Sequence, residues 1–598
     1  MLNKIRKWGF TLVALLLVLS TLAACSSNKN NDSSPSPSQS SSTAAPGDSG
    51  SASPEAQNRE PYTIDIFSML SNFSGEQQGW FAKAVKDKFN LTLNIIASNL
   101  EGGGDTKFSA MMAAGNLGDL VVFGDDGQKY QDAIKTGMLL DWTKNGLLDQ
   151  YGKNIMQYAP KAIEKNSKNF GGGTSVYGIG FDVGDDKPGP SEGKFLTYHP
   201  NIRWDLYQKA GSPVITKMED YLPLLKKMQE LEPKSDSGRP TYAFSMWKDW
   251  DGNMMMNTKA WVGLHGFDEG DGFNPGGFTL ISADQDKVQG VLDEDGYYMR
   301  GLKLYFDANQ MGLVDPDSLT QNFEEVVNKM TDGQILFTWF PWMDTYNTPE
   351  RLEAGKGFAL VPFQEERTFS YGYNPYGGQR VWAIGAKAKH PERVLEFIDW
   401  LYSPEGTMVA NYGPEGLVWK LENGKQVLTE FGEQAMPSNP TPVPEQFGGG
   451  NWKDGKNQIN NTTFKMTNVN PITGDPYDWE LWTSTLAKAP NKMEESWRAA
   501  MGANTAKEYL QQNNLLAVEK QIFTGTAPVP YSDALEQKRG QVAEVIKQYS
   551  WKMVFAKNEA EFGKLKQEMI DKAKGLGYEE VLAFNKEQNQ KAFEYRKQ

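Results

Sequence analysis

Three stretches of the chain combine flat aromatic side chains with residues that can make two hydrogen bonds at once. They are residues 247–251, 339–344 and 371–380. Indole and phenol rings offer an apolar face with a polar tip, and carboxylate and guanidinium groups bind neighbouring hydroxyl groups. This pairing is typical of sites for amphipathic ligands such as sugars. The candidate ligand-binding residues in these stretches are Trp247, Trp250, Trp339, Trp342, Asp344, Tyr373, Tyr376 and Arg380.

Each stretch has a plainer alternative, which is packing in a core or a loop. In the third stretch, Gly372 lies between two tyrosines and lets a backbone or a ligand approach closely, which favours a site. Arg380 has the chemistry to pair with a uronate or another acidic sugar. The alternative for Arg380 is a structural ion pair with a neighbouring carboxylate.

The first globular part of the chain predicts a parallel sheet with helices on its faces. Strands are expected at residues 62–67, 91–96 and 120–123, and helices at 80–89 and 106–114. Ligands of such sheets lie beyond the carboxyl ends of the strands. Asn72 and Asp125 follow the first and third strands and are therefore further candidates, with turn formation or helix capping as their alternative roles. Near the C-terminus, residues 534–549 and 561–576 have helical apolar spacing.

Cys25 is the only cysteine among 598 residues, and it follows the pattern of a secretory signal. Basic residues near the N-terminus precede an apolar run over residues 10–24, which is shorter than a membrane-spanning helix requires. Leu-Ala-Ala-Cys in this setting resembles a bacterial lipobox. We therefore expect a lipoprotein signal peptide at residues 1–24 and lipidation of Cys25. The alternative is an ordinary signal peptide cut near Ala24, with a chance cysteine.

Residues 25–59 are rich in Ser, Pro and Gly and contain no Val, Leu, Ile or aromatic residue. Such a segment cannot bury enough apolar surface to become ordered, so we expect a disordered tether with an r.m.s. span of roughly 30–35 Å.

The composition argues against several classes of function. Lys and Arg total 61 against 75 Asp and Glu, and the net charge of −14 argues against nucleic-acid partners and polybasic membrane contacts. No stretch after the signal is apolar and long enough to span a bilayer. The three histidines are far apart and lack zinc-site spacing. Neither a phosphate-binding loop nor a nucleophile elbow is found.

Several segments within residues 60–420 resemble, in order, the motifs of extracellular solute-binding proteins of carbohydrate transporters. Residues 108–121 resemble the motif FxxMxAsGdlPDlv, with Gly118 in place of the family proline. The further matching segments are residues 176–179, 201–205, 216–221, 332–335, 390–401 and 411–416. Trp204, in the segment Asn-Ile-Arg-Trp-Asp, joins the candidate ligand-binding residues.

The resemblance implies an α/β, two-lobed periplasmic-binding-protein fold of type II, the Venus-flytrap type, with crossover strands and a helical C-terminal part. Lobe 1 is expected at residues 60–182 and 339–390, and lobe 2 at 183–338 and 391–598. The chain is expected to cross between the lobes near residues 178–184, 337–340 and 383–389. Some relatives carry a calcium loop, but the matching residues 234–241 hold one acidic residue, so we expect no metal there.

The resemblance also implies a function. The chain is expected to be a lipid-anchored protein on the extracellular face of the cytoplasmic membrane, in a Gram-positive-type cell envelope. It would capture a sugar or oligosaccharide between its lobes and deliver it to the permease subunits of an ABC importer. We expect a monomer with no catalytic residue, cofactor or nucleic-acid partner, and with membrane contact through the lipid alone.

Two alternatives remain open. One is a lipid-tethered glycoside hydrolase or lyase that uses a carboxylate pair. The other is a ligand-sensing or peptide-binding lipoprotein of the same fold.

Overall fold

The structure is a computed structural model that describes residues 59–97, 105–269, 277–284, 287–436, 441–519, 527 and 529–596. These residues belong to one compact unit, residues 52–598. Cys25, the predicted signal peptide and the predicted tether up to residue 58 lie outside the described residues. In the described ranges, no helix has the length and apolar character that crossing a membrane requires.

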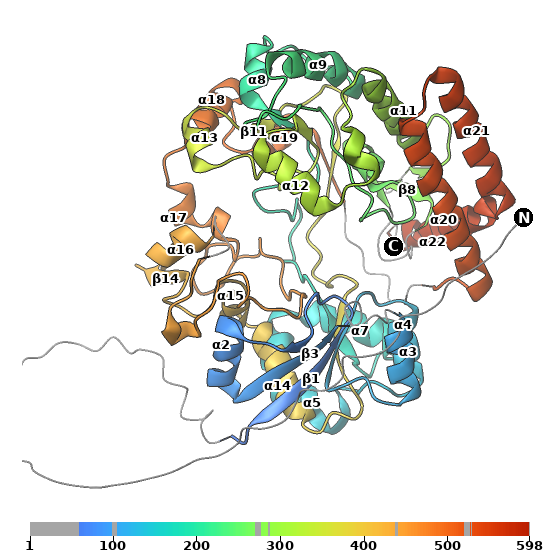
Figure 1. Cartoon of the computed structure of the whole chain (residues 1–598). Coiled ribbons are helices and arrows are strands. Elements are labelled where there is room, and N and C mark those ends of the chain that lie inside the picture. Colours follow the sequence, from blue (N-terminus) through green and yellow to red (C-terminus); the bar gives the residue numbers. More distant parts are fainter. Residues whose placement is uncertain are drawn as a thin grey trace, which may run out of the picture. The chain divides into compact units, whose positions relative to one another are not determined.

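The first lobe is built on a six-stranded sheet with the order β2-β3-β1-β4-β13-β5 (Figure 1). The strands are β1 (Tyr62–Ser68), β2 (Gly75–Glu76), β3 (Leu91–Ala97), β4 (Leu120–Phe123), β5 (Gly178–Gly180) and β13 (Val381–Ile384). Strand β1 pairs in parallel with both β3 and β4, which confirms the predicted parallel arrangement. Strands β2 and β13 run antiparallel to their neighbours, so the complete sheet is mixed.

Each face of this sheet carries a hydrophobic core, since alternate residues of a strand point to opposite sides. Ile66 and Val122 belong to one hydrophobic core, whereas their neighbours Phe67 and Val121 belong to another. The first core takes side chains from α2 (Gly79–Phe89), α5 (Leu147–Tyr151), α6 (Lys153–Tyr158), α7 (Pro160–Phe170), α14 (Pro391–Leu401) and α15 (Pro404–Tyr412). The second core takes side chains from α3 (Asp105–Ala113) and α4 (Gln128–Lys135).

The second lobe contains a short sheet with the order β10-β6-β11. Its strands are β6 (Asn201–Arg203), β10 (Phe337–Thr338) and β11 (Phe358–Leu360). Two further segments extend this sheet, because Tyr242 pairs in parallel with Ile335 and Phe244 pairs in parallel with Val314. The segments around residues 314, 242–244 and 335–338 therefore run in the same direction, and their carboxyl ends share one edge.

Helices surround this sheet and form one large hydrophobic core with it. They are α8 (Trp204–Lys209), α9 (Tyr221–Leu231), α10 (Met256–Gly263), α11 (Tyr297–Gln310), α12 (Phe323–Asp332), α13 (Pro349–Glu353), α18 (Lys492–Met501) and α19 (Ala506–Gln512). The chain ends in α20 (Asp533–Val554), α21 (Glu559–Gly575) and α22 (Tyr578–Arg596), and α20 packs against α11 (Figure 1). Helices α20 and α21 confirm the two helices predicted from apolar spacing.

Smaller elements complete the lobes. The strands are β7 (Phe267–Glu269), β8 (Thr279–Ser282) and β9 (Val288–Gly290) in one sheet, β12 (Thr368–Ser370) with β16 (Leu516–Val518), and β14 (Trp419–Glu422) with β15 (Lys425–Leu428). The short helices are α16 (Glu430–Ala435) and α17 (Thr483–Leu486). The 3-10 turns are Lys144–Gly146, Met218–Asp220, Pro316–Leu319, Glu445–Phe447 and Trp479–Leu481.

The hydrophobic cores group the chain differently from the predicted lobe boundaries. Trp339 and Phe363 were expected in lobe 1, but their side chains lie in the core of the second lobe. Val394 of α14 and Trp482 were expected in lobe 2, but they lie in the core beneath the six-stranded sheet. Apolar spacing shows that a helix such as α14 has one buried face, but it does not show which sheet that face covers.

We therefore propose a first lobe of residues 59–183 and 381–482 and a second lobe of residues 196–363 and 493–596. Three linkers join them, and the first two lie side by side. Pro190 pairs in antiparallel fashion with Gly372, and the Ser191 amide donates to the Tyr371 carbonyl oxygen at 2.8 Å. Lys507 of the second lobe donates from Nζ to the carbonyl oxygen of Glu192 in the first linker at 2.7 Å.

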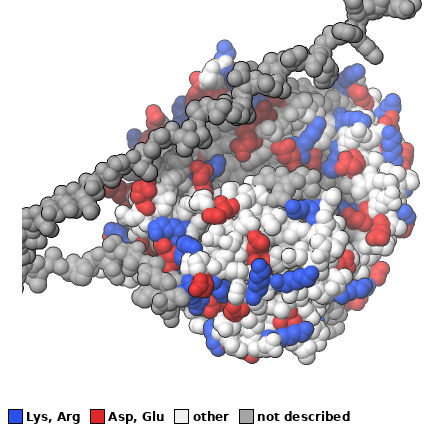
Figure 2. All heavy atoms as spheres, turned by 60° about the horizontal axis from the view of Figure 1, so that its bottom comes forward, with Lys and Arg blue, Asp and Glu red and all other residues white. Residues whose placement is uncertain are grey.

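Charged side chains of both signs are interspersed on the face of the molecule shown in Figure 2. The net charge of −14 therefore does not gather there into one acidic area. The polar pocket of the first lobe, described below, differs from this mixed surface because its charged lining residues are all basic.

Candidate functional site

Four aromatic side chains of the second lobe form a partly exposed surface that we call the aromatic shelf. Its members are Trp250, Phe323, Phe340 and Trp342. The Trp250 ring centroid lies 4.3 Å from that of Phe323 and 5.8 Å from that of Trp342. Trp250 and Trp342 are each 41% exposed, whereas Phe340 is buried beneath them. The shelf thus presents two indole rings to solvent on an apolar base.

The shelf lies where the parallel segments of the second lobe end. Trp250 follows segment 242–244, Phe323 follows the segment at residue 314, and Trp342 follows β10. Ligands of open α/β sheets lie beyond the carboxyl ends of the strands. The topology of the lobe therefore places the shelf at the edge where a ligand is expected.

Polar contacts fix the loops that carry the shelf. The Phe323 amide donates to Asp249 Oδ2 at 2.8 Å, which joins the start of α12 to the loop of Trp250. Gln321 donates from Nε2 to the Met246 carbonyl oxygen at 2.8 Å, deeper in the same two loops. Because these two loops are tied to each other, Trp250 and Phe323 are held in place before a ligand arrives.

The other tryptophans among the candidates are core residues. Trp247 and Trp339 are 1% and 2% exposed, and among the described residues their indole N–H groups have no hydrogen-bond partner. The Trp247 ring supports Trp250 from below at a centroid distance of 5.2 Å. Trp204 is also buried and donates from Nε1 to Ser496 Oγ at 3.0 Å. Trp204 does not lie among the rings of the shelf.

Asp344 follows the shelf along the chain but has a different environment. Burial raises the pKa of its carboxyl to about 6, against the opposing charge of Lys194. Lys194 itself forms an ion pair with Glu480 at 3.0 Å. Asp344 therefore belongs to a charged cluster near the first linker.

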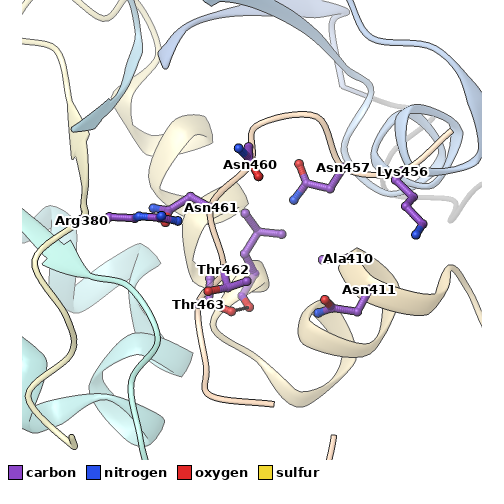
Figure 3. A pocket seen from close by; sticks show the side chains of 10 residues that line it. Arg380, Ala410, Asn411, Lys456, Asn457, Asn460, Asn461, Thr462 and Thr463 are labelled. Atoms are coloured by element: carbon purple, nitrogen blue, oxygen red, sulfur yellow. Dashed lines mark hydrogen bonds between the residues drawn. The ribbon is translucent and has the colours of Figure 1, made fainter. Parts of the chain in front are cut away.

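A polar pocket of about 250 Å³ lies in the first lobe (Figure 3). The residues that line it are Arg380, Leu401, Ala410, Asn411, Lys456, Asn457, Asn460, Asn461, Thr462 and Thr463. The loop of residues 457–463 is fixed at the carboxyl end of β1, since Ser68 Oγ donates to the Ile459 carbonyl oxygen at 3.0 Å. Arg380 immediately precedes β13, which runs antiparallel to β4, so it lies at this same edge of the sheet. Like the shelf, the pocket occupies the ligand-binding edge of its lobe.

Arg380 is half-buried, and no carboxylate among the described residues lies within ion-pairing distance of its guanidinium. Its guanidinium stacks 4.9 Å from the Phe181 ring centroid. Burial lowers the pKa of the Arg380 side chain, and the charge of Asp182 opposes this effect. Asp182 is itself paired with Lys465 at 3.0 Å. The structural ion pair that was the alternative for Arg380 is therefore not formed within the described part of the chain.

The remaining candidates have contacts with the protein. Tyr373 lies 4.4 Å beneath the Lys187 ammonium, and its hydroxyl donates to the Thr467 carbonyl oxygen at 3.3 Å. Tyr376 lies 5.5 Å from the Lys161 ammonium. Asp125 is exposed and accepts a hydrogen bond from the Gly127 amide at 2.8 Å, as a turn former does. Asn72 is exposed in the loop after β1.

The sequence predictions named only Arg380 among the lining residues of the pocket and missed the others, including Asn411, Lys456, Asn457 and Asn461. A run of polar residues, Asn460-Asn461-Thr462-Thr463, was visible in the sequence. Nothing local to that run shows that it folds back to the end of β1, almost 400 residues earlier in the chain. Only the tertiary fold identifies it as part of a pocket.

Comparisons with known proteins support the fold. No family model and no curated protein matches the chain. A solved alginate-binding protein, AlgQ2, is 17% identical, with a TM-score of 0.58 over 89% of this chain and 98% of its own. The ABC-transporter substrate-binding protein FusA of S. pneumoniae, solved with kestose, is 14% identical, with a TM-score of 0.57 over 90% of this chain and 100% of its own.

A third solved structure is an HMO-binding, ABC-transporter-associated solute-binding protein of Bifidobacterium longum infantis. It is 14% identical, with a TM-score of 0.54 over 89% of this chain and 99% of its own. The chain has the two-lobed fold of these solute-binding proteins, which confirms the predicted fold class. Because the sequence identities are low, this likeness establishes the fold but does not identify the ligand. The ligand has to be inferred from the residues of the site.

Proposed function

We propose that the chain is an extracellular solute-binding protein that captures a sugar or an oligosaccharide. The observation that carries this proposal is the aromatic shelf, where two tryptophan rings are each 41% exposed at the ligand-binding edge of the second lobe. Rings of this size are seldom left exposed together unless they bind something. Indole faces stack on the apolar faces of sugar rings while the surrounding polar groups bind hydroxyls.

The solved structures of the same fold support a saccharide as the ligand. Those proteins bind alginate, kestose and HMO, respectively. The polar pocket of the first lobe adds amide, hydroxyl and guanidinium groups suited to hydroxyl-rich ligands. A solute that contacts the shelf and the pocket together binds a closed arrangement of the lobes more tightly than an open one, and so shifts the hinge equilibrium toward closure.

A thermal-shift screen tests the proposal. Neutral oligosaccharides, acidic oligosaccharides and peptides would each be added to the purified protein. We expect a saccharide to raise the unfolding temperature, because a ligand at a hundredfold excess over its Kd stabilises the folded state by about 2.7 kcal/mol. Stabilisation by peptides alone would favour the peptide-binding alternative. Hydrolysis or lyase products from a stabilising saccharide would favour the enzyme alternative.

We also propose that the protein is anchored by a lipid on Cys25 and delivers its solute to the permease of an ABC importer. The lipobox-like Leu-Ala-Ala-Cys sequence and the Ser-rich segment after it support the anchor. Stable anchoring requires more than a single acyl chain, as in the two-signal rule for membrane-bound proteins.

Replacing Cys25 by alanine should release the protein from the membrane into the medium. The saccharide affinity should stay the same, because the site lies in the globular lobes. Immunoblots of membrane and medium fractions measure the distribution. A Cys25→Ala variant that remains in the membrane fraction would contradict the lipid anchor. Cys25→Ser is the matched conservative change and, since it also removes the thiol, should be released in the same way.

A further inference from the structure

The polar pocket of the first lobe has positive charge and no acidic side chain. Its lining includes Arg380 and Lys456 but neither Asp nor Glu. Over the whole chain, acidic residues outnumber basic ones by 75 to 61. Figure 3 shows Arg380 at one end of the pocket and Lys456 at the other. A ligand group inside this pocket therefore meets a positive field.

The Arg380 guanidinium reaches the pocket without a carboxylate partner among the described residues. A guanidinium presents N–H donors in a planar fork that matches the two oxygens of a carboxylate. An arginine that is half-buried and not ion-paired has given up part of its hydration without a compensating charge. A ligand carboxylate would supply that charge.

One side-chain amide of the pocket also lacks hydrogen-bond partners among the described residues. Three of its four asparagines have protein partners: Asn411 Nδ2 donates to the Thr407 carbonyl oxygen at 2.8 Å, Asn457 Oδ1 accepts from the Ile459 amide at 3.0 Å, and Asn460 Nδ2 donates to the Leu70 carbonyl oxygen at 2.6 Å. Asn461 is 6% exposed, and both its Oδ1 and its Nδ2 lack a hydrogen-bond partner among the described residues.

A buried amide without partners is costly, typically about 1–3 kcal/mol. Native structures rarely leave such a group unpaired unless a ligand or water completes it. Arg380 and Asn461 both line the pocket, so a ligand group inside it has access to both (Figure 3). The pocket volume of about 250 Å³ lies just below the range of roughly 300–1,000 Å³ usual for small-molecule sites. This volume suits one substituent or one ring of a larger ligand.

We propose that this pocket binds the carboxylate of an acidic saccharide, through paired hydrogen bonds from Arg380 and a further one from the Asn461 amide. The inference rests on the proposed function, since the remaining sugar rings would lie on the aromatic shelf or on the pocket rim. Lys456 adds long-range attraction. The substrate class is therefore a uronate-containing oligosaccharide.

Titration calorimetry with uronate trimers and their methyl esters tests this inference. Trimers of galacturonate, glucuronate and mannuronate would be compared with the corresponding esters, which keep the sugar rings and remove the charge. We expect at least one uronate trimer to bind at least tenfold more tightly than its ester. Replacement of Arg380 by glutamine should weaken binding of that uronate roughly 10- to 100-fold and leave binding of the ester unchanged.

Two variants sharpen the test. Asn461→Ala should weaken uronate binding by a factor of roughly 10, at the low end for the loss of one hydrogen bond to a charged group. Arg239 is exposed outside the pocket, so Arg239→Gln is the matched control and should change neither affinity. An Arg380→Gln protein that keeps the full preference for the uronate would overturn the assignment of the pocket.

The same titrations separate this inference from the proposed function. If neutral oligosaccharides bind and no uronate trimer binds more tightly than its ester, the acidic substrate class is wrong and saccharide capture stands. If no saccharide of either class binds, both proposals fail. Measuring the unfolding midpoint of each variant shows that a loss of affinity does not come from a loss of folding.

Discussion

Replacing Trp250 and Trp342 together by alanine should raise the Kd for the captured saccharide by roughly a hundredfold or more. Each ring is 41% exposed at the ligand-binding edge of the second lobe and is held by packing against Phe323. Aromatic anchors of binding sites typically lose at least about 2 kcal/mol when truncated, which is about thirtyfold in Kd for each. Titration calorimetry with a saccharide that stabilises the wild-type protein measures the change.

Two control variants make this result specific. Replacing both residues by phenylalanine keeps a ring at each position and should preserve most of the affinity. Leu486 is 61% exposed in α17, between the two proposed lobes, so Leu486→Ala removes a comparably exposed apolar side chain and should leave the Kd unchanged. The function of the shelf would be refuted by a double alanine variant that binds the saccharide as tightly as the wild type.

Replacing Arg203 by alanine should destabilise the protein by roughly 3–5 kcal/mol. Arg203 is fully buried, and its guanidinium donates to both carboxylate oxygens of Asp205 at 2.9 Å and to Glu232 at 2.9 Å. It also stacks 4.2 Å from the Tyr346 ring centroid. Removing one partner of a buried ion pair leaves the other charges uncompensated, and this is the source of the large expected loss.

Thermal unfolding followed by tryptophan fluorescence should show a midpoint lowered by roughly 5–9 °C for Arg203→Ala, with the second lobe as the unfolding unit. Arg239 is exposed, so Arg239→Ala should change the free energy of unfolding by less than about 0.5 kcal/mol. If Arg203→Ala lowers the free energy of unfolding by less than 1 kcal/mol, the three hydrogen bonds of Arg203 do not organise the core of the second lobe.

The local elements of the first lobe could be predicted closely from the sequence. Strands β1 and β3 largely alternate apolar and polar residues, and β4 is a short apolar run. The structure places all three within one residue of the predicted ends. Helices with one apolar face, such as α2 and α20, could be predicted for the same reason. These signals are carried by neighbouring residues, so no tertiary information is needed to read them.

The site could be predicted only in part, because exposure depends on tertiary packing. Trp247 and Trp250 are three residues apart and chemically identical, yet one is 1% exposed and the other 41%. Arg380 was a candidate by its chemistry, and the structure places it in a pocket. Asn461 was not a candidate, because its place in the pocket with Arg380 depends on a loop that returns to β1 from a distant part of the chain. Lobe membership of α14 could not be predicted for the same reason.

The central claim, capture of an unmodified saccharide, is tested most directly by equilibrium dialysis followed by chemical analysis of the ligand. The protein would be saturated with the most stabilising saccharide from the screen, separated from free ligand and then denatured. We predict saturable binding of about one equivalent of saccharide, released with its length and linkages unchanged. Failure of every saccharide to bind saturably, or release of shortened or unsaturated products, would contradict the account.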